Sequence, residues 1–473
     1  MSKREKNGNE INRRDFVTKS GALIALGAIG MATPSSLFGM IRKPKLKIRI
    51  TNVSSNFERE SLYPYRFKGS AVTQLWQTVA YLQSESGISK IGLGTQNPLW
   101  SDSTVAGLHS ENGGHALMYS MSEMALQMMK GTSFTNPIAL QEEILPEVYA
   151  YGRKITKNPD LKMTFALNAL VCADNAAWLL YAQENNISSF DDLIPNSYKP
   201  GLSYRHKEVA SIPSFPVGTD IEIIKAAADE GYFIMKLKTG SAGDQKQMLE
   251  NDIAFMTAVH NAIGHYETPY TENGKIPYYI DANGRYETKE TLQRFIDHLD
   301  KIGALGQVAI IEEPLRESDE SYVGDLGVTI GADESAHTVE DAANRIDQGY
   351  GAIVVKAIAK TLSMTMKITQ LAYEKKIPCF SADLTVNPIL VDWNKNIAAR
   401  LAPLPGMTIG LLETNGHQYY KNWDKMMSYY PNAGAEWVKT SNGVYQTGES
   451  FYNKSGGIFD LSSHYKELFE YSK

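Results

Sequence analysis

The sequence predicts an α/β protein in which a TIM-type (β/α) barrel follows an α+β capping domain. Two observations predict this fold. Short β-branched or aromatic runs alternate with helix-like segments over residues 206–415, which is typical of βα units. A charged residue ends or follows many of these runs, once per βα unit, which takes about 30 residues. Because the parallel strands of a barrel all end on one face, we expect these charges to converge there.

We expect four regions along the 473 residues. They are an export signal and linker over 1–42, the capping domain over 43–205, the barrel over 206–415, and a C-terminal tail over 416–473 that packs on the capping domain. Such a length is sufficient for two domains with cores of their own. Three runs over 46–96 predict an antiparallel sheet, and helical periodicity follows, most clearly over 163–185.

The barrel region contains eight strand-like runs, over 209–215, 233–238, 278–283, 308–313, 328–333, 352–357, 378–383 and 407–414. Helix-like segments cover 219–231, 244–263, 288–303, 338–349, 362–376 and 388–401. The connection between the fourth and fifth runs is short, and we expect it to lack a full helix. Eight strands in such an alternation favour a closed barrel over an open sheet.

Composition excludes several classes of protein. The chain is 43% hydrophobic and 21% charged, as in an ordinary soluble globule. Its net charge of −6 and the lack of basic residues clustered with aromatics argue against a nucleic-acid partner. The two cysteines, Cys172 and Cys379, lie far apart in apolar segments, which predicts buried thiols rather than a disulfide framework.

The N-terminus resembles an export signal. Residues 12–17 read NRRDFV, and an apolar stretch follows over 21–31, in the order typical of a twin-arginine signal. The alternative is a short buried or membrane helix, but the apolar run is well below the ~20 residues that span a bilayer. We therefore expect a periplasmic or otherwise exported protein with no stable membrane anchor.

The charges at the strand ends suggest a metal site flanked by bases. They belong to Lys236, Lys238, Asp281, Glu312, Asp333 and Lys356. A single carboxylate there is more simply a helix N-cap, and a single lysine a solvated surface group. Lysines embedded in the apolar runs IMKLK and IVVKAI are costly to bury without partners, however. Oxygen ligands with no Cys or His suit Mg²⁺ or Mn²⁺ rather than zinc.

The ordered set K-x-K, D-x-N, E-E-P, A-D-E-S and a late strand-end lysine resembles the enolase superfamily, and within it the muconate lactonizing enzyme subgroup of the mandelate racemase/muconate lactonizing enzyme family. The resemblance covers residues 46–415. It implies that one Mg²⁺ ion, or Mn²⁺ in its place, is bound by Asp281, Glu312 and Asp333. Asn283 resembles a supporting polar group near the metal and the substrate.

The resemblance also implies the roles of the lysines. Lys238 and Lys356 would be the acid/base residues, and Lys236 would lie beside the substrate carboxylate. Lys238 ends the second predicted strand and Lys356 the sixth, so they lie opposite each other in an eight-stranded barrel. Burial and neighbouring positive charge are expected to lower the pKa of a catalytic lysine toward working pH.

Two acidic doublets, Glu312-Glu313 and Asp333-Glu334, leave a choice of ligand. Consecutive strand residues face opposite ways, so only one of each pair is expected to point inward, and the family pattern favours the first. Two further residues near these strand ends are expected to have structural rather than catalytic roles. Lys360 is expected to have a structural or rim role, and His337 to mark a helix start rather than serve as a base.

Substrate contacts are expected at the barrel mouth. Loops of the capping domain close over the mouth in this superfamily, and the matching stretches are 57–68, with Tyr63, Tyr65 and Arg66, and 95–101, with Trp100. These stretches either form an aromatic lid or pack between the domains. Asp383 at the seventh strand end is another candidate. Dipeptide epimerases of the subgroup carry Asp-x-Asp on the last strand, where this chain has Glu413-Thr414-Asn415, leaving Glu413 to hold a substrate ammonium.

The resulting prediction is a Mg²⁺-dependent racemase or epimerase that abstracts the proton α to a carboxylate through an enediolate, by 1,1-proton transfer between two lysines. Two alternatives remain. One is a dehydratase or cycloisomerase of the same superfamily acting on a sugar acid, and the other is an exported binding protein without turnover. The expected partner is a small carboxylate substrate, and we expect a homo-oligomer.

Overall fold

The computed structural model describes residues 46–68 and 70–470. All of them belong to one compact unit, Lys45–Lys473, so the boundary predicted between residues 205 and 206 stays a prediction. The export signal predicted over residues 1–42 lies outside the described residues.

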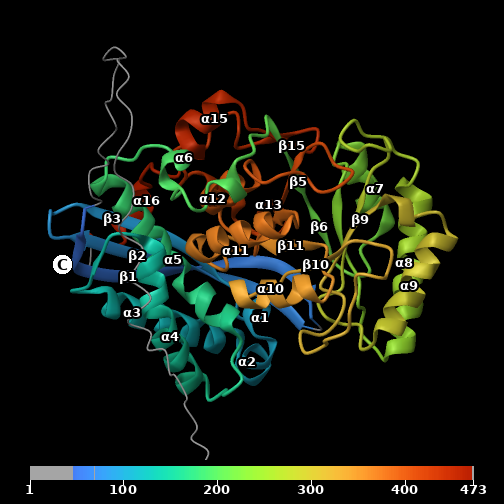
Figure 1. Ribbon diagram of the computed structural model, residues 1–473, viewed down its shortest axis with the longest axis horizontal. Coiled ribbons are helices and arrows are strands. Elements are labelled where there is room, and N and C mark those ends of the chain that lie inside the picture. Colours follow the sequence, from blue (N-terminus) through green and yellow to red (C-terminus); the bar gives the residue numbers. More distant parts are fainter. Residues whose placement is uncertain (1–45, 69, 471–473) are drawn as a thin grey trace, which may run out of the picture. The chain divides into compact units, whose positions relative to one another are not determined.

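An antiparallel sheet opens the described chain (Figure 1). Its strands, in the order β3-β2-β1-β4, are β1 (Ile48–Phe67), β2 (Ser70–Ser84), β3 (Ser89–Gln96) and β4 (Ser133–Phe134). The first three include the predicted runs, but β1 continues to Phe67 through residues 57–67, a stretch predicted as a loop. β4 is too short to show an alternating pattern. The pairing of β1 with β2 slips between Ser61 and Tyr65. The Tyr65 hydroxyl lies 2.9 Å from Ser214 Oγ of the barrel, so the end of this hairpin reaches the barrel mouth.

Helices follow this sheet in the capping region. They are α1 (Pro98–Ser101), α2 (Ser103–Leu108), α3 (Glu111–Met129), α4 (Pro137–Thr156), α5 (Met163–Glu184) and α6 (Phe190–Leu193). Of these, α3 and α5 pack directly on the long strands of the sheet. By length and composition α5 could cross a membrane, but 94% of its most apolar stretch is buried within the protein. A helix that is apolar on all sides and buried in this way is a core helix. It packs against β3 at Gly92, where a Cβ atom would lie 2.1 Å from Cys172 O.

Eight parallel strand positions form the barrel. Their strands are β5 (Glu208–Ile212), β6 (Ser214–Phe215), β7 (Met235–Lys238), β8 (Tyr278–Asp281), β9 (Val308–Glu312), β10 (Ile330–Ala332), β11 (Ala352–Val355), β12 (Cys379–Ser381) and β13 (Gly410–Glu413). They coincide with the eight predicted runs, because β5 and β6 are two halves of the first run, separated by Pro213. β5 pairs with β13 and β6 pairs with β7, so the split strand closes the ring.

Pro213 lies at the closure for a physical reason. Proline has no backbone N–H to give to a ladder, but its carbonyl still accepts a hydrogen bond from Lys236 N at 2.9 Å. The first strand therefore changes partner at this residue without leaving the ring. The fold class predicted from the sequence, a TIM-type barrel behind an α+β cap, is confirmed.

The barrel helices fall within the six predicted segments. They are α7 (Ile221–Asp229), α8 (Gln245–Ile263), α9 (Lys289–Lys301), α10 (Val339–Asp347), α11 (Leu362–Lys375) and α12 (Pro388–Ala398). Asp244, Thr288 and Thr338 cap three of them by accepting backbone N–H bonds, as N-cap side chains do. In the described chain, residues 313–329 between β9 and β10 contain no helix, as predicted.

The tail contains α13 (Gly416–Tyr419), α14 (Trp423–Met427), β14 (Thr440–Ser441), β15 (Val444–Gln446), α15 (Glu449–Lys454) and α16 (Ser463–Glu467). It touches the capping sheet, where His464 Nε2 lies 2.9 Å from Glu58 Oε2. It also adds β15 to β5 of the barrel, antiparallel, and covers α12. Lys395 Nζ on that buried helix donates to Asp392 Oδ1 at 2.5 Å and to Trp437 O of the tail at 2.6 Å.

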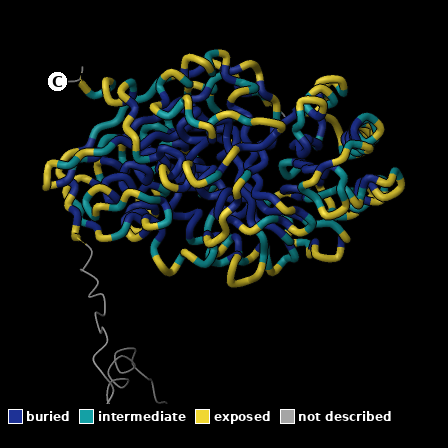
Figure 2. The backbone as a smooth tube through the Cα atoms, turned by 90° about the horizontal axis from the view of Figure 1, so that it is seen from above, coloured by how far each residue is buried: buried dark blue, intermediate teal, exposed yellow. Residues whose placement is uncertain are grey.

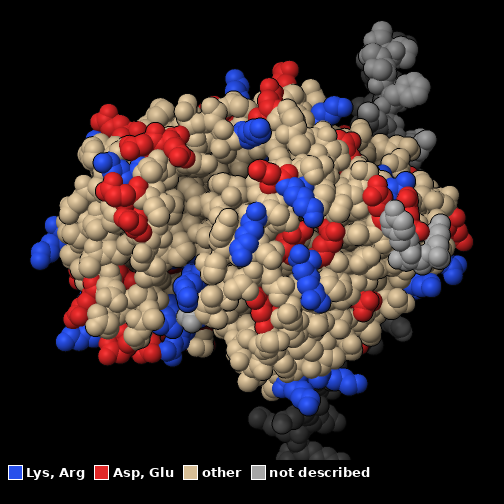
Figure 3. All heavy atoms as spheres, turned by 180° about the vertical axis from the view of Figure 1, so that it is seen from behind, with Lys and Arg blue, Asp and Glu red and all other residues tan. Residues whose placement is uncertain are grey.

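Buried residues are concentrated in the interior of the described chain (Figure 2). Lys, Arg, Asp and Glu are interspersed on the face in Figure 3. Cys172 and Cys379 are buried free thiols, as predicted.

Substituting Gly92 tests the contact between β3 and α5. We expect Gly92→Ala to lower the free energy of unfolding by about 1–3 kcal/mol, the usual cost of overpacking, because the nearest atoms are backbone. Gly107→Ala is the control, since nothing lies within 4 Å of a Cβ there. Urea unfolding measures both variants, and equal stability of the two would contradict this packing.

Asp174 of α5 joins the cap to Ser363 of α11. Its Oδ2 accepts from Ser363 N at 3.1 Å and its Oδ1 from Ser363 Oγ at 2.5 Å. Burial raises the pKa of Asp174 from 3.8 to about 7.

The pKa of Asp174 is higher in the folded protein than in the unfolded chain. The folded protein therefore retains a proton on Asp174 that the unfolded chain loses between pH 4 and 7. The free energy of unfolding should therefore fall as pH rises through this window, by up to about 4 kcal/mol. Asp174→Asn should flatten that slope in urea unfolding at pH 4, 5.5 and 7. Parallel curves for variant and wild type would contradict the assignment.

Candidate active site at the carboxyl ends of the strands

A small cavity of about 30 Å³ lies where the barrel strands end. Among the residues that line it are Lys236, Lys238, Asn283, Asp333, Lys356, Asp383 and Glu413 from the barrel and Tyr65, Phe67 and Trp100 from the cap. The barrel thus brings together the side chains that the sequence places at separate strand ends. A cavity of this size holds about one water molecule, so little free space remains among these side chains.

Lys236 connects the carboxylates on one side of the site. Its ammonium lies 2.9 Å from Asp281 Oδ2, 2.8 Å from Glu312 Oε2 and 3.0 Å from Glu413 Oε2. The side chain is 2% exposed. Burial alone would lower the pKa of Lys236, but these three carboxylates raise it well above its ordinary value. Lys236 therefore compensates the negative charge of carboxylates from three strands.

Glu312, Asp333 and Glu334 form a group suited to a cation. One oxygen from each lies within 4.8 Å of the others. Glu312 Oε1, Asp333 Oδ1 and Glu334 Oε2 are buried, and no described residue donates a hydrogen bond to them; Lys360 Nζ is 3.4 Å from Asp333 Oδ1. Buried carboxylate oxygens without donors fit a hard divalent cation such as Mg²⁺.

Asp281 lies beside this group rather than within it. Its Oδ1 accepts from Asn283 N at 2.9 Å, and its Oδ2 is bonded to both Lys236 and Lys238. Burial opposes ionisation, but the two lysines lower the pKa of Asp281 to about 2. The predicted role of Asp281 as a metal ligand stays a prediction.

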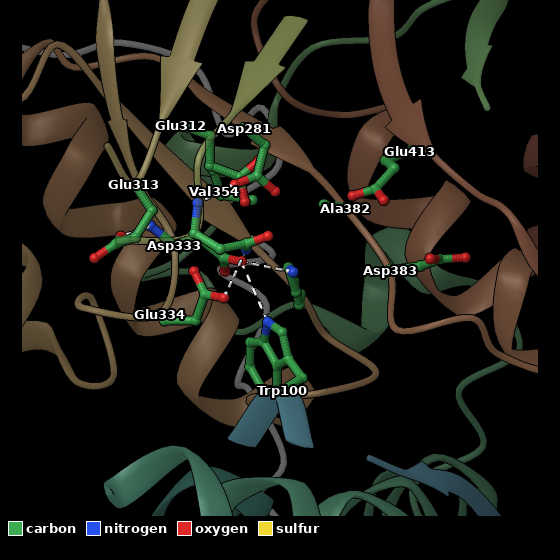
Figure 4. A network of polar contacts seen from close by, with 12 residues as sticks. Trp100, Asp281, Glu312, Glu313, Asp333, Glu334, Val354, Ala382, Asp383 and Glu413 are labelled. Atoms are coloured by element: carbon green, nitrogen blue, oxygen red, sulfur yellow. Dashed lines mark hydrogen bonds and ion pairs between the residues drawn. The ribbon is translucent and has the colours of Figure 1, made fainter. Parts of the chain in front are cut away.

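The two acidic doublets behave differently (Figure 4). Glu312 points into the site, whereas Glu313 turns away and accepts bonds from Asp333 N and Ser335 Oγ at 2.8 and 3.0 Å. In the second doublet, Asp333 lines the inner cavity and Glu334 lines the outer groove, and one oxygen of each still lies within 4.8 Å of Glu312. Both residues follow the end of β10 at Ala332, where the alternation of a strand no longer applies, so the choice of the first member as the ligand stays a prediction.

Glu312 and Asp333 differ in the direction of their pKa shifts. Burial and the neighbouring Asp281 raise the pKa of Glu312 well above its ordinary value. Burial works against ionisation of Asp333 as well, but Lys356 and Lys360 hold its pKa well below the ordinary value. A cation bound beside Glu312 would oppose the shift there by stabilising its ionised form.

Lys238 and Lys356 face the cavity from opposite strands. Three strands separate β7 from β11 in either direction round the ring. Lys238 Nζ lies 2.5 Å from Asp281 Oδ2 and 2.8 Å from Asn283 Oδ1. Lys356 Nζ lies 2.7 Å from Asp333 Oδ2 and 4.8 Å from the centre of the Trp100 ring.

The expectation of a lowered lysine pKa is wrong for Lys356 as the site stands here. Burial lowers the pKa of Lys356, but Asp333 and then other carboxylates outweigh it and raise the pKa above its ordinary value. The sequence shows the burial but not the distance to Asp333.

Asp383 and Glu413 lie across the site from the cation group (Figure 4). Asp383 follows β12, Glu413 ends the neighbouring strand β13, and both line the cavity. Burial and the charge of Glu413 raise the pKa of Asp383 to about 7. Asp383 accepts bonds from the backbone N–H groups of Thr385 and Asn415 and forms no ion pair with any described residue.

The cap contributes Trp100 but not Tyr63. The Trp100 indole N–H donates to Asp333 Oδ2 at 3.4 Å. Tyr63 is 58% exposed and lies outside the cavity, so its predicted contact with substrate has no support here. Tyr65 lines the cavity instead, because the slip in β1 after Ser61 resets which residues face the barrel.

Lys360 and His337, the two residues given structural roles from the sequence, both have partners near the site. Lys360 Nζ donates to the carbonyls of Asp333, Ala336 and Val354, which agrees with a structural role. His337 precedes α10 but also contacts Glu317. This pair lines an outer groove of about 820 Å³ rather than the inner cavity, and no sequence spacing indicated it.

Comparison with known proteins gives a family match in the barrel. Residues 221–407 match the model of the enolase C-terminal domain-like family. A search of curated proteins found no match. The matched residues form most of the barrel, so this region carries the enolase-type domain that the sequence motifs predicted.

Solved structures share the fold at low identity. A dipeptide epimerase from Enterococcus faecalis V583, complexed with Mg and the dipeptide L-Leu-L-Tyr, is 17% identical with a TM-score of 0.60, over 84% of this chain and 97% of that one. The L-Ala-D/L-Glu epimerase from Bacillus subtilis is 16% identical with a TM-score of 0.59, over 84% and 96%. A mandelate racemase/muconate lactonizing protein from Herpetosiphon aurantiacus is 14% identical with a TM-score of 0.59, over 85% and 96%.

Glutamine substitutions test which acidic residue faces the cation. Glu312→Gln should weaken binding of Mn²⁺ at least about tenfold, since even indirect partners of a metal ligand contribute that much. Glu313→Gln is the matched control and should bind within about threefold of wild type. Titration calorimetry measures both. Equal losses in the two variants would contradict the inward position of Glu312.

Proposed function

We propose that this protein is a Mg²⁺-dependent racemase or epimerase that moves the proton α to a substrate carboxylate between Lys238 and Lys356. The observation that carries the proposal is the position of these two lysines, on opposite strands of one barrel and lining one cavity. Two amines that approach one carbon from its two faces suit removal of a proton by one and its return by the other.

The site supplies the other requirements of this reaction. Glu312, Asp333 and Glu334, with Asp281 as the ligand implied by the family motif, would hold the divalent cation. A cation there supplies Lewis-acid stabilisation of charge that develops on a substrate carboxylate. Lys236 adds a fixed positive charge for the enediolate, already oriented by its three carboxylate partners, and such preorganisation is commonly the largest catalytic contribution.

The lysines must change protonation state during the cycle. Lys356 is held as an ammonium by Asp333, so it is ready to give a proton rather than take one. Because Asp333 belongs to the cation group, a cation bound there would offset its charge and lower the pKa of Lys356. Cation binding would thus prepare the base as well as the substrate.

Asp383 and Glu413 favour a substrate that carries an amino group as well as a carboxylate. The last strand provides only Glu413, but Asp383 on the neighbouring strand supplies a second carboxylate beside it. A substrate ammonium would give Asp383 an ion-pair partner and would share Glu413 with Lys236. Two of the structural relatives are epimerases of dipeptides, which makes dipeptides and N-terminally free amino acids the first compounds to test.

We also propose that the enzyme is exported, on the basis of the NRRDFV segment and the apolar stretch after it, and that it is a homo-oligomer.

Solvent exchange tests the reaction directly. The protein is incubated with Mg²⁺ in D₂O and a mixed library of amino acids, N-acyl amino acids, dipeptides and sugar acids, and mass spectrometry reads the products. We expect one substrate to gain one deuterium with no other change in mass. Loss of water would instead identify a dehydratase, and an unchanged library in the presence of bound metal would contradict the proposal.

Variants assign the exchange to the two lysines. Lys356→Ala and Lys238→Ala should each lower the rate of racemisation by about 10²–10⁴-fold, the usual contribution of a general acid or base, while the substrate still binds. Lys246→Ala, whose side chain is 87% exposed, is the control and should keep full activity. Wild-type rates in either active-site variant would refute the two-lysine mechanism.

A further inference from the structure

One lysine of the cap contacts the cation group directly. Lys68 lies at the turn that follows β1, with a positive φ of 49°. Its ammonium is 2.9 Å from Glu334 Oε1 and donates to Trp100 O at 2.9 Å. The side chains of Lys68 and Glu334 are 11% and 4% exposed, so this ion pair is largely shielded from solvent.

The same contact determines which oxygen of Glu334 is left for a cation. Glu334 Oε1 accepts from Lys68 and, at 3.0 Å, from Asn283 Nδ2. Glu334 Oε2 has no donor among the described residues, and Glu334 offers an oxygen to the group with Glu312 and Asp333. Two hydrogen bonds on one oxygen fix the rotamer of a flexible side chain and leave its other oxygen toward the group.

A second bond from the cap ends on the same group. The Trp100 indole donates to Asp333 Oδ2, and the Trp100 carbonyl accepts from Lys68. Lys68 and Trp100 together therefore connect the cap to two adjacent carboxylates, Asp333 and Glu334, on the loop after β10.

We propose that Lys68 is a positioning residue that couples the seating of the β1–β2 turn to cation binding, by holding Glu334 in the orientation that a cation requires. This inference rests on the cation site of the proposed function and not on the identity of the reaction. It concerns a residue that does not itself bind the cation.

Two effects of Lys68 on the cation oppose each other. Its positive charge repels a cation nearby, but the charge is paired with Glu334 and with the Trp100 carbonyl. Lys68 also orients Glu334, which would otherwise lose rotamer freedom when it binds the cation. Hydrogen-bond partners of metal ligands typically change metal affinity by about 10–100-fold. We therefore expect orientation to dominate and loss of Lys68 to weaken cation binding by about tenfold.

Coupling of this kind is reciprocal. If a seated turn strengthens cation binding, a bound cation must favour the seated turn by the same factor. Lys68 lines the groove of about 820 Å³, and its neighbour Phe67 lines the inner cavity of about 30 Å³. The residues at the end of β1 therefore contact both the cation group and the cavity where a substrate would bind.

Titration calorimetry with Mn²⁺ tests the affinity. Lys68→Met should raise the dissociation constant about tenfold, and Lys68→Arg, which keeps the ion pair, should restore most of the loss. Arg66→Met is the matched control, since Arg66 is exposed on the same hairpin and forms no ion pair with a described residue. The double variant Lys68→Met/Glu334→Gln should bind no more weakly than Glu334→Gln alone, because Lys68 acts through Glu334.

Amide hydrogen exchange tests the coupling to the turn. In wild type, Mn²⁺ should slow exchange over residues 62–76, and in Lys68→Met that protection should be lost. Unchanged or tighter binding in Lys68→Met, or additive losses in the double variant, would overturn the inference. If wild type bound no divalent cation, the cation site itself would fail, and that result is distinct from the others.

Discussion

The arrangement of the site depends on one constraint, the burial of several like charges at the ends of adjacent strands. Asp281, Glu312 and Glu413 end strands β8, β9 and β13, and in a low-dielectric interior they are tolerated only if positive charge compensates them. Lys236 provides that charge by contacting all three. Lys356 does the same for Asp333. The barrel mouth is therefore a network of ion pairs between ammonium and carboxylate groups. A divalent cation fits where carboxylate oxygens have no hydrogen-bond donor.

The fold could be predicted from the sequence because its signals are local and repeated. Each barrel strand is a short apolar run, and each predicted helix segment contains a helix in the structure. Lys236, Lys238 and Lys356 could be predicted for the same reason, since a lysine inside an apolar run stands out. The first barrel strand is also recognisable as one apolar run, although it is split at Pro213, because the split changes only which strand it pairs with.

Other parts of the site depend on geometry that no local pattern contains. Glu334 joins the cation group because β10 stops one residue before Asp333, an end point that a two-residue alternation does not reveal. Tyr65 rather than Tyr63 reaches the cavity because of a slip between β1 and β2. The raised pKa of Lys356 depends on its distance to Asp333. In each case the deciding fact is a contact between segments far apart in the chain or the position where a strand ends.

The measurement that tests the central claim most directly is a crystal structure of the Mn²⁺-loaded protein with anomalous scattering. The account predicts one strong anomalous peak within about 2.5 Å of carboxylate oxygens from Glu312 and Asp333, with Lys238 and Lys356 on opposite sides of the adjoining cavity. The same map would show which of Asp281 and Glu334 completes the ligand set. A peak remote from Glu312 and Asp333, or none at saturating Mn²⁺, would contradict the account.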